Sequence, residues 1–146
     1  MSKVWVVVAD SSRARVLESP NRVGPLTEVE SLQNPEARAM NKDLNTDKPG
    51  RSFDSAGQGR HAMEPGIDAK QVEAIQFARR LRHFLKEQSE AKKFNKLVLA
   101  AAPDFLGLLR DNLDKVVREK ISVEQDKDLV KETPEKIRES LPDFLY

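Results

Sequence analysis

Val4-Trp5-Val6-Val7-Val8-Ala9 is a nearly unbroken apolar run at the start of this 146-residue sequence, and four of its six residues are β-branched. β-branched side chains favour strands, and a strand that is apolar at every position must be covered on both of its faces. The run therefore predicts a buried strand at the centre of a sheet, with the rest of the chain packed around it.

The next two segments predict an antiparallel meander beside this strand. Asp10-Ser11-Ser12 has turn chemistry, because short polar side chains bond backbone amides two residues further on. Residues 13–18 alternate loosely between polar and apolar. After several Pro and Gly breaks, the apolar residues of 26–32 are separated by two polar residues each. Each segment predicts a strand, the second of them half exposed.

The hydrophobic pattern lapses over residues 35–66, a length that in a compact domain is usually functional or disordered. Its most distinctive part runs from Gly50 to Gly66 and contains Ala56-Gly57-Gln58-Gly59-Arg60-His61. Two glycines around a glutamine leave the backbone free to adopt positive φ and to approach a ligand closely. We predict a long functional loop with a catalytic or binding tip. Its five basic and five acidic residues make it neutral as a whole.

A helix is predicted from Asp68, a plausible N-cap, to about Lys93. Its apolar residues recur at spacings of three and four and predict a wide core face: Val72, Ile75, Phe77, Ala78, Leu81, Phe84 and Leu85. On the other face seven basic residues outnumber four acidic ones, and Arg79, Arg80 and Arg82 stand out among them. Such a face is most often simply solvated, but it is also suited to binding phosphates.

The remainder of the chain predicts a crossover back into the sheet. Residues 96–102 form a second buried strand, Pro103-Asp104 opens a helix, and Val116-Val117 lies on a short helical turn. Residues 121–124 predict an edge strand, and Thr133-Pro134 a final helix. The order is three strands, helix, strand, helix, strand, helix. We therefore expect an α/β fold, a single ribonuclease H-like domain over residues 1–146 with a mixed five-stranded sheet.

Composition excludes several classes of function. The net charge is +1, so a domain-wide basic field for nucleic-acid binding is absent and any RNA contact must be local. The sequence has no cysteine and two histidines, which excludes disulfides, thiol catalysis and cysteine-based zinc sites. We expect no metal or cofactor. The N-terminal apolar run is too short for a signal peptide, and no run reaches membrane-spanning length, so we expect a soluble cytoplasmic protein.

Several stretches together resemble the bacterial host attachment protein family, described as proteins required for attachment to host cells. They are the Val4–Asp10 strand, Gly50-Arg51-Ser52-Phe53-Asp54-Ser55, Gly59-Arg60-His61, and the run from Lys96 to Gly107. That family in turn resembles the middle domain of archaeal and eukaryotic class-1 peptide-chain release factors, in which a Gly-Gly-Gln loop precedes a long basic helix. Here the motif falls on Ala56-Gly57-Gln58, with alanine in place of the first glycine.

The resemblance implies a factor that hydrolyses peptidyl-tRNA on or near the ribosome. The ester carbonyl needs a positioned water and a hydrogen-bond donor for the developing charge, which the Gly57-Gln58-Gly59 backbone and the Gln58 amide would supply. Six basic residues would hold RNA phosphates: Arg51, Arg60, His61, Arg79, Arg80 and Arg82.

Two other classes of function remain open. A metal-dependent nuclease of the ribonuclease H type would need several carboxylates around divalent ions, and Asp10, Asp104 and Glu73 are the candidates. Asp10 also suits a turn, and Asp104 a helix N-terminus. The third class is a non-catalytic interaction protein that binds RNA or protein, or that affects attachment indirectly.

Overall fold

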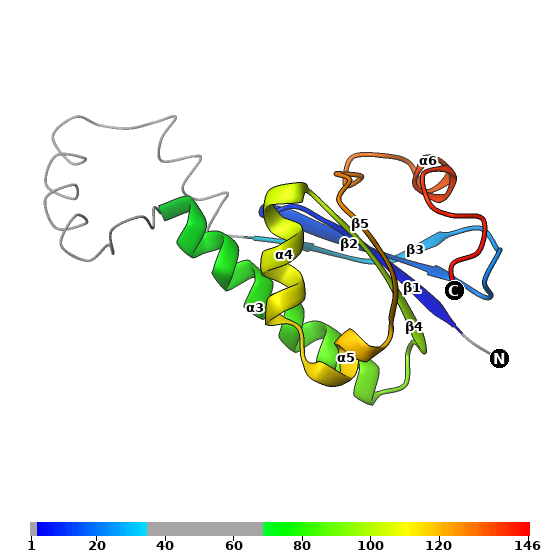
Figure 1. Cartoon of the computed structure of the whole chain (residues 1–146), viewed down its shortest axis with the longest axis horizontal. Coiled ribbons are helices and arrows are strands. Elements are labelled where there is room, and N and C mark those ends of the chain that lie inside the picture. The colour runs from blue at the N-terminus through cyan, green and yellow to red at the C-terminus, as the bar shows by residue number, and fades with distance from the viewer. Residues whose placement is uncertain (1–2, 35–68) are drawn as a thin grey trace, which may run out of the picture.

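The computed structural model describes residues 3–34 and 69–146. Five strands form one sheet in the order β3-β2-β1-β4-β5 (Figure 1). The strands are β1 (Val4–Ala9), β2 (Arg13–Ser19), β3 (Thr27–Gln33), β4 (Lys96–Ala101) and β5 (Ile121–Gln125). The helices are α3 (Ala69–Glu90), α4 (Pro103–Asn112), α5 (Lys115–Glu119) and α6 (Pro134–Glu139).

Strand β1 lies at the centre of the sheet, as its composition predicts. It pairs antiparallel with β2 and parallel with β4, and all six of its residues are buried. Strands β1, β2 and β3 form the predicted meander, and α3 carries the chain across to β4. This strand order and mixture of directions confirm the ribonuclease H-like α/β fold.

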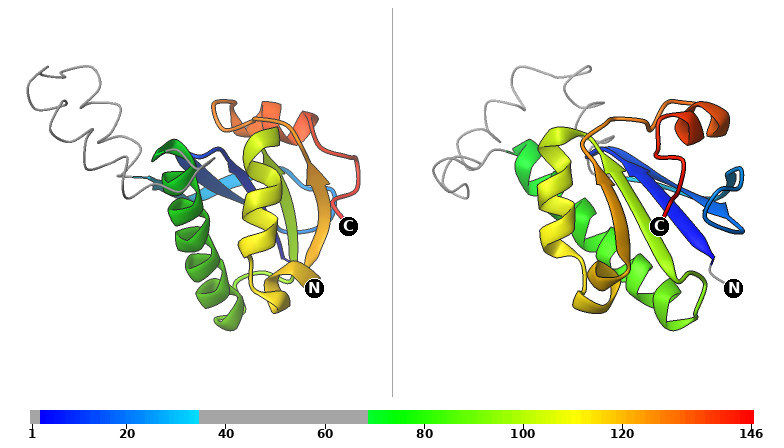
Figure 2. Two further views of the ribbon diagram at one scale, coloured as in Figure 1. Left: turned by 60° about the vertical axis from the view of Figure 1, so that its left-hand side comes forward. Right: turned by 45° about the vertical axis from the view of Figure 1, so that its right-hand side comes forward.

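The two faces of the sheet are covered by different elements (Figure 2). Helices α3 and α4 pack on one face, where Trp5, Val7 and Leu99 meet Leu81 and Phe105. Trp5 stacks on Phe94 and Phe84, with ring centroids 5.0 and 6.2 Å away. Helix α6 and the chain after it cover the other face. Each face buries its own apolar cluster, which is why β1 and β4 are apolar throughout.

Helix α3 differs from its prediction at its C-terminal end and in the burial of its first turns. It ends at Glu90 rather than near Lys93, and Lys92 takes a positive φ of 61° just beyond it. Val72 is 38% exposed, and Ile75 is only half buried. The reason is visible in Figure 1, where the start of α3 projects past the ends of the strands and has no sheet beneath it. The predicted cap at Asp68 lies outside the described residues.

Strand β3 is more exposed than predicted. Only Leu32 is partly buried within it, and Val29 is 45% exposed. The pairing with β2 passes from Val16 with Glu30 to Leu17 with Glu28, so Val29 is the extra residue of a β-bulge and has no partner. At the bulge, the side chain of Val29 is exposed to solvent, although Val29 is one of the apolar residues that predict this strand.

Within residues 3–34 and 69–146, no helix combines the length and the apolar character needed to cross a membrane.

Candidate functional site

The predicted site falls on two parts of the chain. Six of its residues lie outside the described residues: Arg51, Gly57, Gln58, Gly59, Arg60 and His61. The structure does place the residues that flank this segment, and it places the three arginines of α3.

Asn34 fixes the point at which the chain leaves the sheet. Its side chain is 1% exposed, and its Nδ2 donates to the carbonyl oxygens of Ser11, at 3.1 Å, and Glu73, at 3.2 Å. Its backbone N–H donates to the Ser12 carbonyl at 2.8 Å. One buried amide thus joins the end of β3, the β1–β2 turn and the second turn of α3. Residues 35–68 are therefore bracketed by Asn34 and Ala69 at one corner of the domain.

This corner lies at the carboxyl ends of the two central parallel strands. The backbone N–H of Ala102, just after β4, donates to the carbonyl of Ala9 at 3.1 Å, so the two strand ends lie side by side. In open α/β sheets, ligands bind outside the carboxyl ends of the strands. The two residues that border segment 35–68, Asn34 and Ala69, consequently lie at the edge of the sheet where ligands bind in such folds.

The three arginines of α3 differ in their surroundings. Arg80 donates from Nη1 to the Gln33 carbonyl at 3.1 Å, which holds α3 against the end of β3. Arg79 and Arg82 are exposed, and within the described part of the chain neither forms an ion pair or a side-chain hydrogen bond. One donor of Arg80 is thus used in a structural hydrogen bond, whereas the guanidinium donors of Arg79 and Arg82 are available to a ligand.

A shallow groove of about 440 Å³ runs beside these arginines. His83 lies on its rim, 3.4 Å from Glu87 one turn further along the helix, an ion pair only when the imidazole is protonated. The groove combines cationic and apolar groups, which suits a phosphate chain with its attached bases better than an uncharged ligand. Its lining residues are Leu32, Arg79, Arg80, His83, Phe84 and Glu87.

Two of the three candidate carboxylates of a nuclease, Asp10 and Asp104, have structural roles. Asp10 Oδ1 accepts from the backbone N–H groups of Ser12, at 2.8 Å, and Arg13, at 2.9 Å, which closes the β1–β2 turn. Asp104 lies in the first turn of α4, where a negative charge is favoured by the helix dipole. Among the residues that the structure describes, no three His, Asp or Glu side chains gather in a way that could hold a metal ion.

The sequence interpretation missed two features near this corner. Asn34 is the last residue before the hydrophobic pattern lapses. An asparagine between a strand and a proline is a common place for a structural side-chain hydrogen bond. Arg13 and Arg15 alternate with apolar residues in β2, and this spacing puts both on one face of the strand. That face is covered rather than open to solvent.

The sequence of this chain matches the family model described as "Protein required for attachment to host cells" over residues 5–141. No curated protein matches it significantly.

Solved structures resemble it in fold. The crystal structure of the archaeal translation termination factor aRF1 matches with a TM-score of 0.50 and 10% sequence identity, over 97% of this chain and 35% of that one. The Ppx/GppA phosphatase of Aquifex aeolicus matches with a TM-score of 0.40 and 13% identity, over 86% of this chain and 35% of that one. The chain therefore spans about a third of each protein, and the similarity to aRF1 is one of fold.

Proposed function

The chain belongs to the family of proteins described as required for attachment to host cells, and within that family we propose that it is a translation-linked factor that binds tRNA or ribosomal RNA. The exposed arginines Arg79 and Arg82 would make the phosphate contacts. The fold shared with an archaeal translation termination factor supports this proposal, although fold alone does not determine function. Such a factor works in the cytoplasm.

The observation that carries the proposal is the state of the arginines on α3. Arg79 and Arg82 are exposed, and no carboxylate lies within ion-pair distance of either in the described residues. Guanidinium groups in this state can take up phosphates without first breaking an interaction, and each contact releases a condensed counterion from the nucleic acid. Because the net charge is only +1, such a local cluster is needed to direct RNA to one face.

The chemistry that we propose is hydrolysis of the peptidyl-tRNA ester. Water would add to the ester carbonyl, giving the peptide carboxylic acid and restoring the 3′-hydroxyl of the tRNA. The Gly57-Gln58-Gly59 backbone would donate to the developing oxyanion, and the Gln58 amide would orient the water. Arg51, Arg60 and His61 would add contacts to the terminal phosphates. The segment that holds these residues follows Asn34, which is bonded to α3, and precedes Ala69, the first residue of α3.

Co-sedimentation with ribosomes tests the binding proposal. Empty ribosomes and ribosomes stalled with peptidyl-tRNA are incubated with the wild type and with the double variant Arg79→Glu/Arg82→Glu, in which Arg80 is kept because it holds α3 to Gln33. The matched control is Lys115→Glu/Arg118→Glu, which makes the same charge change at exposed positions of α5. Circular dichroism verifies that all three proteins are folded.

We expect salt-sensitive binding to stalled ribosomes that the α3 variant loses and the α5 control keeps. The slope of log affinity against log salt should decrease by about two when two phosphate contacts are removed. Equal loss in both variants would indicate non-specific attraction and would contradict the assignment to α3. Peptide release by wild type but not by Gln58→Ala, at nearly unchanged melting temperature, would extend the assignment to the loop.

A second candidate function is non-catalytic binding of a protein partner, and the family description favours it. Leu32 and Phe84 give the α3 groove an apolar floor between charged rims, a combination found in protein interfaces. If ribosomes do not retain the protein in the experiment above, cross-linking from an Arg79→Cys variant is the appropriate next test. A specific cross-linked protein would support this second function.

A further inference from the structure

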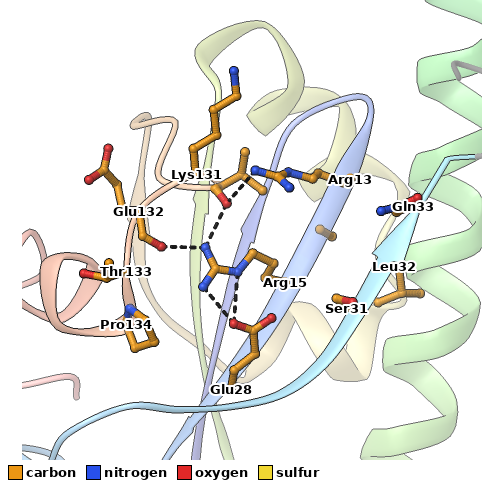
Figure 3. Close-up of a pocket in the computed structure, with 12 residues that line it drawn as sticks. Arg13, Arg15, Glu28, Ser31, Leu32, Gln33, Lys131, Glu132, Thr133 and Pro134 are labelled. Atoms are coloured by element: carbon orange, nitrogen blue, oxygen red, sulfur yellow. Dashed lines mark hydrogen bonds and ion pairs between the residues drawn. The ribbon is translucent and has the colours of Figure 1, made fainter.

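A second pocket, distinct from the α3 groove, lies on the sheet face that carries α6 (Figure 3). It encloses about 440 Å³ between β2, β3 and residues 130–134. Arg15 of β2 pairs with Ser31 of β3, and Arg13 with Gln33, so these side chains share one face of the sheet. The volume is in the range of small-molecule sites. We call it the β2 pocket.

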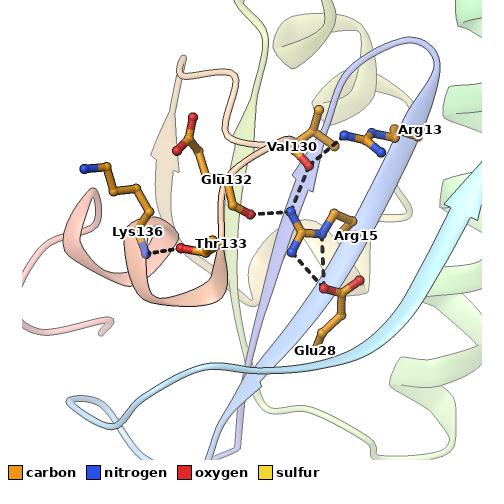
Figure 4. A network of polar contacts seen from close by, with 7 residues as sticks. All are labelled: Arg13, Arg15, Glu28, Val130, Glu132, Thr133 and Lys136. Carbon is orange, nitrogen blue, oxygen red and sulfur yellow. Dashed lines mark hydrogen bonds and ion pairs between the residues drawn. The ribbon is translucent and has the colours of Figure 1, made fainter.

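Two guanidinium groups meet in the β2 pocket on a single acceptor. The Val130 carbonyl oxygen accepts from Arg15 Nη1 at 2.8 Å and from Arg13 Nη2 at 3.2 Å (Figure 4). The same Nη1 of Arg15 also donates to the Glu132 carbonyl at 2.6 Å. Since both cations touch one oxygen atom, their positive charges lie side by side in a partly buried setting, where like charges repel more strongly than in water.

Only one of these two charges is balanced. Glu28 Oε1 accepts from Arg15 Nη2 at 2.7 Å and from Nε at 3.2 Å, which neutralises Arg15. Arg13 has no carboxylate partner in the part of the chain that the structure describes, and Lys131 at the rim has none there either. The Glu132 carboxylate points away from the pocket, and only its backbone carbonyl faces Arg15 (Figure 3). The Lys131 ammonium likewise extends away from Arg13 and Arg15 (Figure 3). Among the described residues, Arg13 is therefore the unbalanced charge inside the pocket.

We propose that the β2 pocket binds the phosphate group of a small phosphorylated molecule. A phosphate monoester carries about −1.5 to −2 charges at neutral pH, which complements the unbalanced Arg13 guanidinium. Arg13 keeps free N–H donors beyond the one given to Val130, and guanidinium groups bind phosphate oxygens through paired hydrogen bonds. Lys131 lines the rim on the opposite wall, and the Ser31 hydroxyl lies on the same strand face as Arg13 and Arg15.

The dimensions of the pocket favour a small molecule over a polymer. Its walls are two neighbouring strands on one side and the 130–134 segment on the other, which Arg15 holds in place through two backbone carbonyls. A site fixed by a buried side chain is preorganised, so ligand binding does not have to order the wall. The α3 groove lies on the opposite face of the sheet, and it shares one lining residue, Leu32, with this pocket.

Titration of the full chain with inorganic phosphate and with glycerol 3-phosphate, followed by calorimetry and by amide NMR shifts, tests the proposal. The variants are Lys131→Gln, at an exposed rim position, and Arg13→Gln/Lys131→Gln. Lys115→Gln/Arg118→Gln on α5 is the charge-matched control. We expect saturable millimolar binding with shifts confined to β2, β3 and residues 130–134, weakened at least tenfold in the double variant and unchanged in the control.

The single variant keeps the test decisive if Arg13→Gln unfolds the protein, since Lys131→Gln alone should weaken binding several-fold. Absence of saturable binding, or equal weakening in the α5 control, would overturn the proposal. Vesicles that contain phosphatidic acid form a further arm. Binding to these vesicles without binding of either soluble phosphate would also overturn it, because the ligand would then be a lipid surface.

Discussion

At the scale of single residues, Arg15 is the side chain on which the wall of the β2 pocket depends. Its side chain is 13% exposed, and it bonds Glu28 and two backbone carbonyls. Replacing it with alanine leaves the Glu132 carbonyl without this donor, leaves the Val130 carbonyl with Arg13 alone, and leaves Glu28 without its partner. Hydrogen bonds to charged groups contribute about 1.5 to 3 kcal/mol, so we expect Arg15→Ala to lower the free energy of unfolding by about 2 to 4 kcal/mol in urea denaturation.

The matched control for this prediction is Arg118→Ala. Arg118 is exposed on α5, and a substitution there should change the free energy of unfolding by less than about 0.5 kcal/mol. If Arg15→Ala were as mild as the control, the 130–134 segment would have to be held by its apolar contacts alone.

Asn34 is the second residue with a large expected effect. Its amide donates to Ser11 and Glu73 in a position that is 1% exposed, and a buried acceptor that loses its donor costs about 1 to 3 kcal/mol. We expect Asn34→Ala to destabilise the protein by that amount in chemical denaturation. Asn112→Ala, which removes one bond to Leu108 within α4 at 2.9 Å, should cost less. The reverse order would show that Asn34 does not join the three elements as described.

At the scale of elements, helix α3 shows that a residue can belong to the apolar stripe of a helix without being buried. Val72 and Leu81 both belong to its apolar stripe, yet Val72 is 38% exposed and Leu81 is fully buried. We therefore expect Leu81→Ala to cost about 2 to 5 kcal/mol and Val72→Ala less than about 0.5 kcal/mol, both measured by denaturant unfolding. A large effect of Val72→Ala would mean that the first turns of α3 are covered in solution by another part of the chain.

Strand β3 illustrates a different limit of sequence patterns. The predicted strand is present, although its apolar residues Leu26, Val29 and Leu32 are three positions apart and do not follow the two-residue period of the pleat. A bulge, however, depends on the register between two strands, and a single strand's pattern carries no information about its partner. The exposure of Val29 therefore becomes visible only when the pairing with β2 is known.

At the scale of the whole molecule, the chain after α6 returns across the sheet and closes the second face. Leu145 is fully buried, its N–H donates to the Arg22 carbonyl at 2.8 Å, and its carbonyl accepts from Ser122 Oγ at 2.7 Å. We expect Leu145→Ala to cost about 2 to 5 kcal/mol in thermal or chemical unfolding. Phe144→Ala should cost about 1 kcal/mol or less, since Phe144 is 59% exposed and packs mainly against the Arg22 guanidinium. Similar losses in the two variants would contradict this packing.

The fold was far more predictable than the site. Val4–Ala9 and Leu97–Ala101 are apolar throughout because both faces of the sheet are covered. The position of these strands in the sheet can therefore be predicted from their composition. The β2 pocket depends on Arg13 and Arg15 meeting Val130, more than a hundred residues away. No local pattern encodes such a contact. The predicted loop tip at Gly57-Gln58-Gly59 remains a prediction, while Arg80 acquires a structural role that its sequence context does not reveal.

Asn34 and Glu73 touch across 39 positions of sequence, and Ala69 begins α3 only one turn, about 6 Å, before Glu73. A chain that leaves and re-enters a scaffold at neighbouring points can be exchanged for another of different length at little entropic cost, since closure entropy grows only with the logarithm of length. Residues 35–68 are in this sense an exchangeable cassette. Protein engineers can graft a foreign peptide at the same two points without removing any residue that packs in β1, β4 or α3.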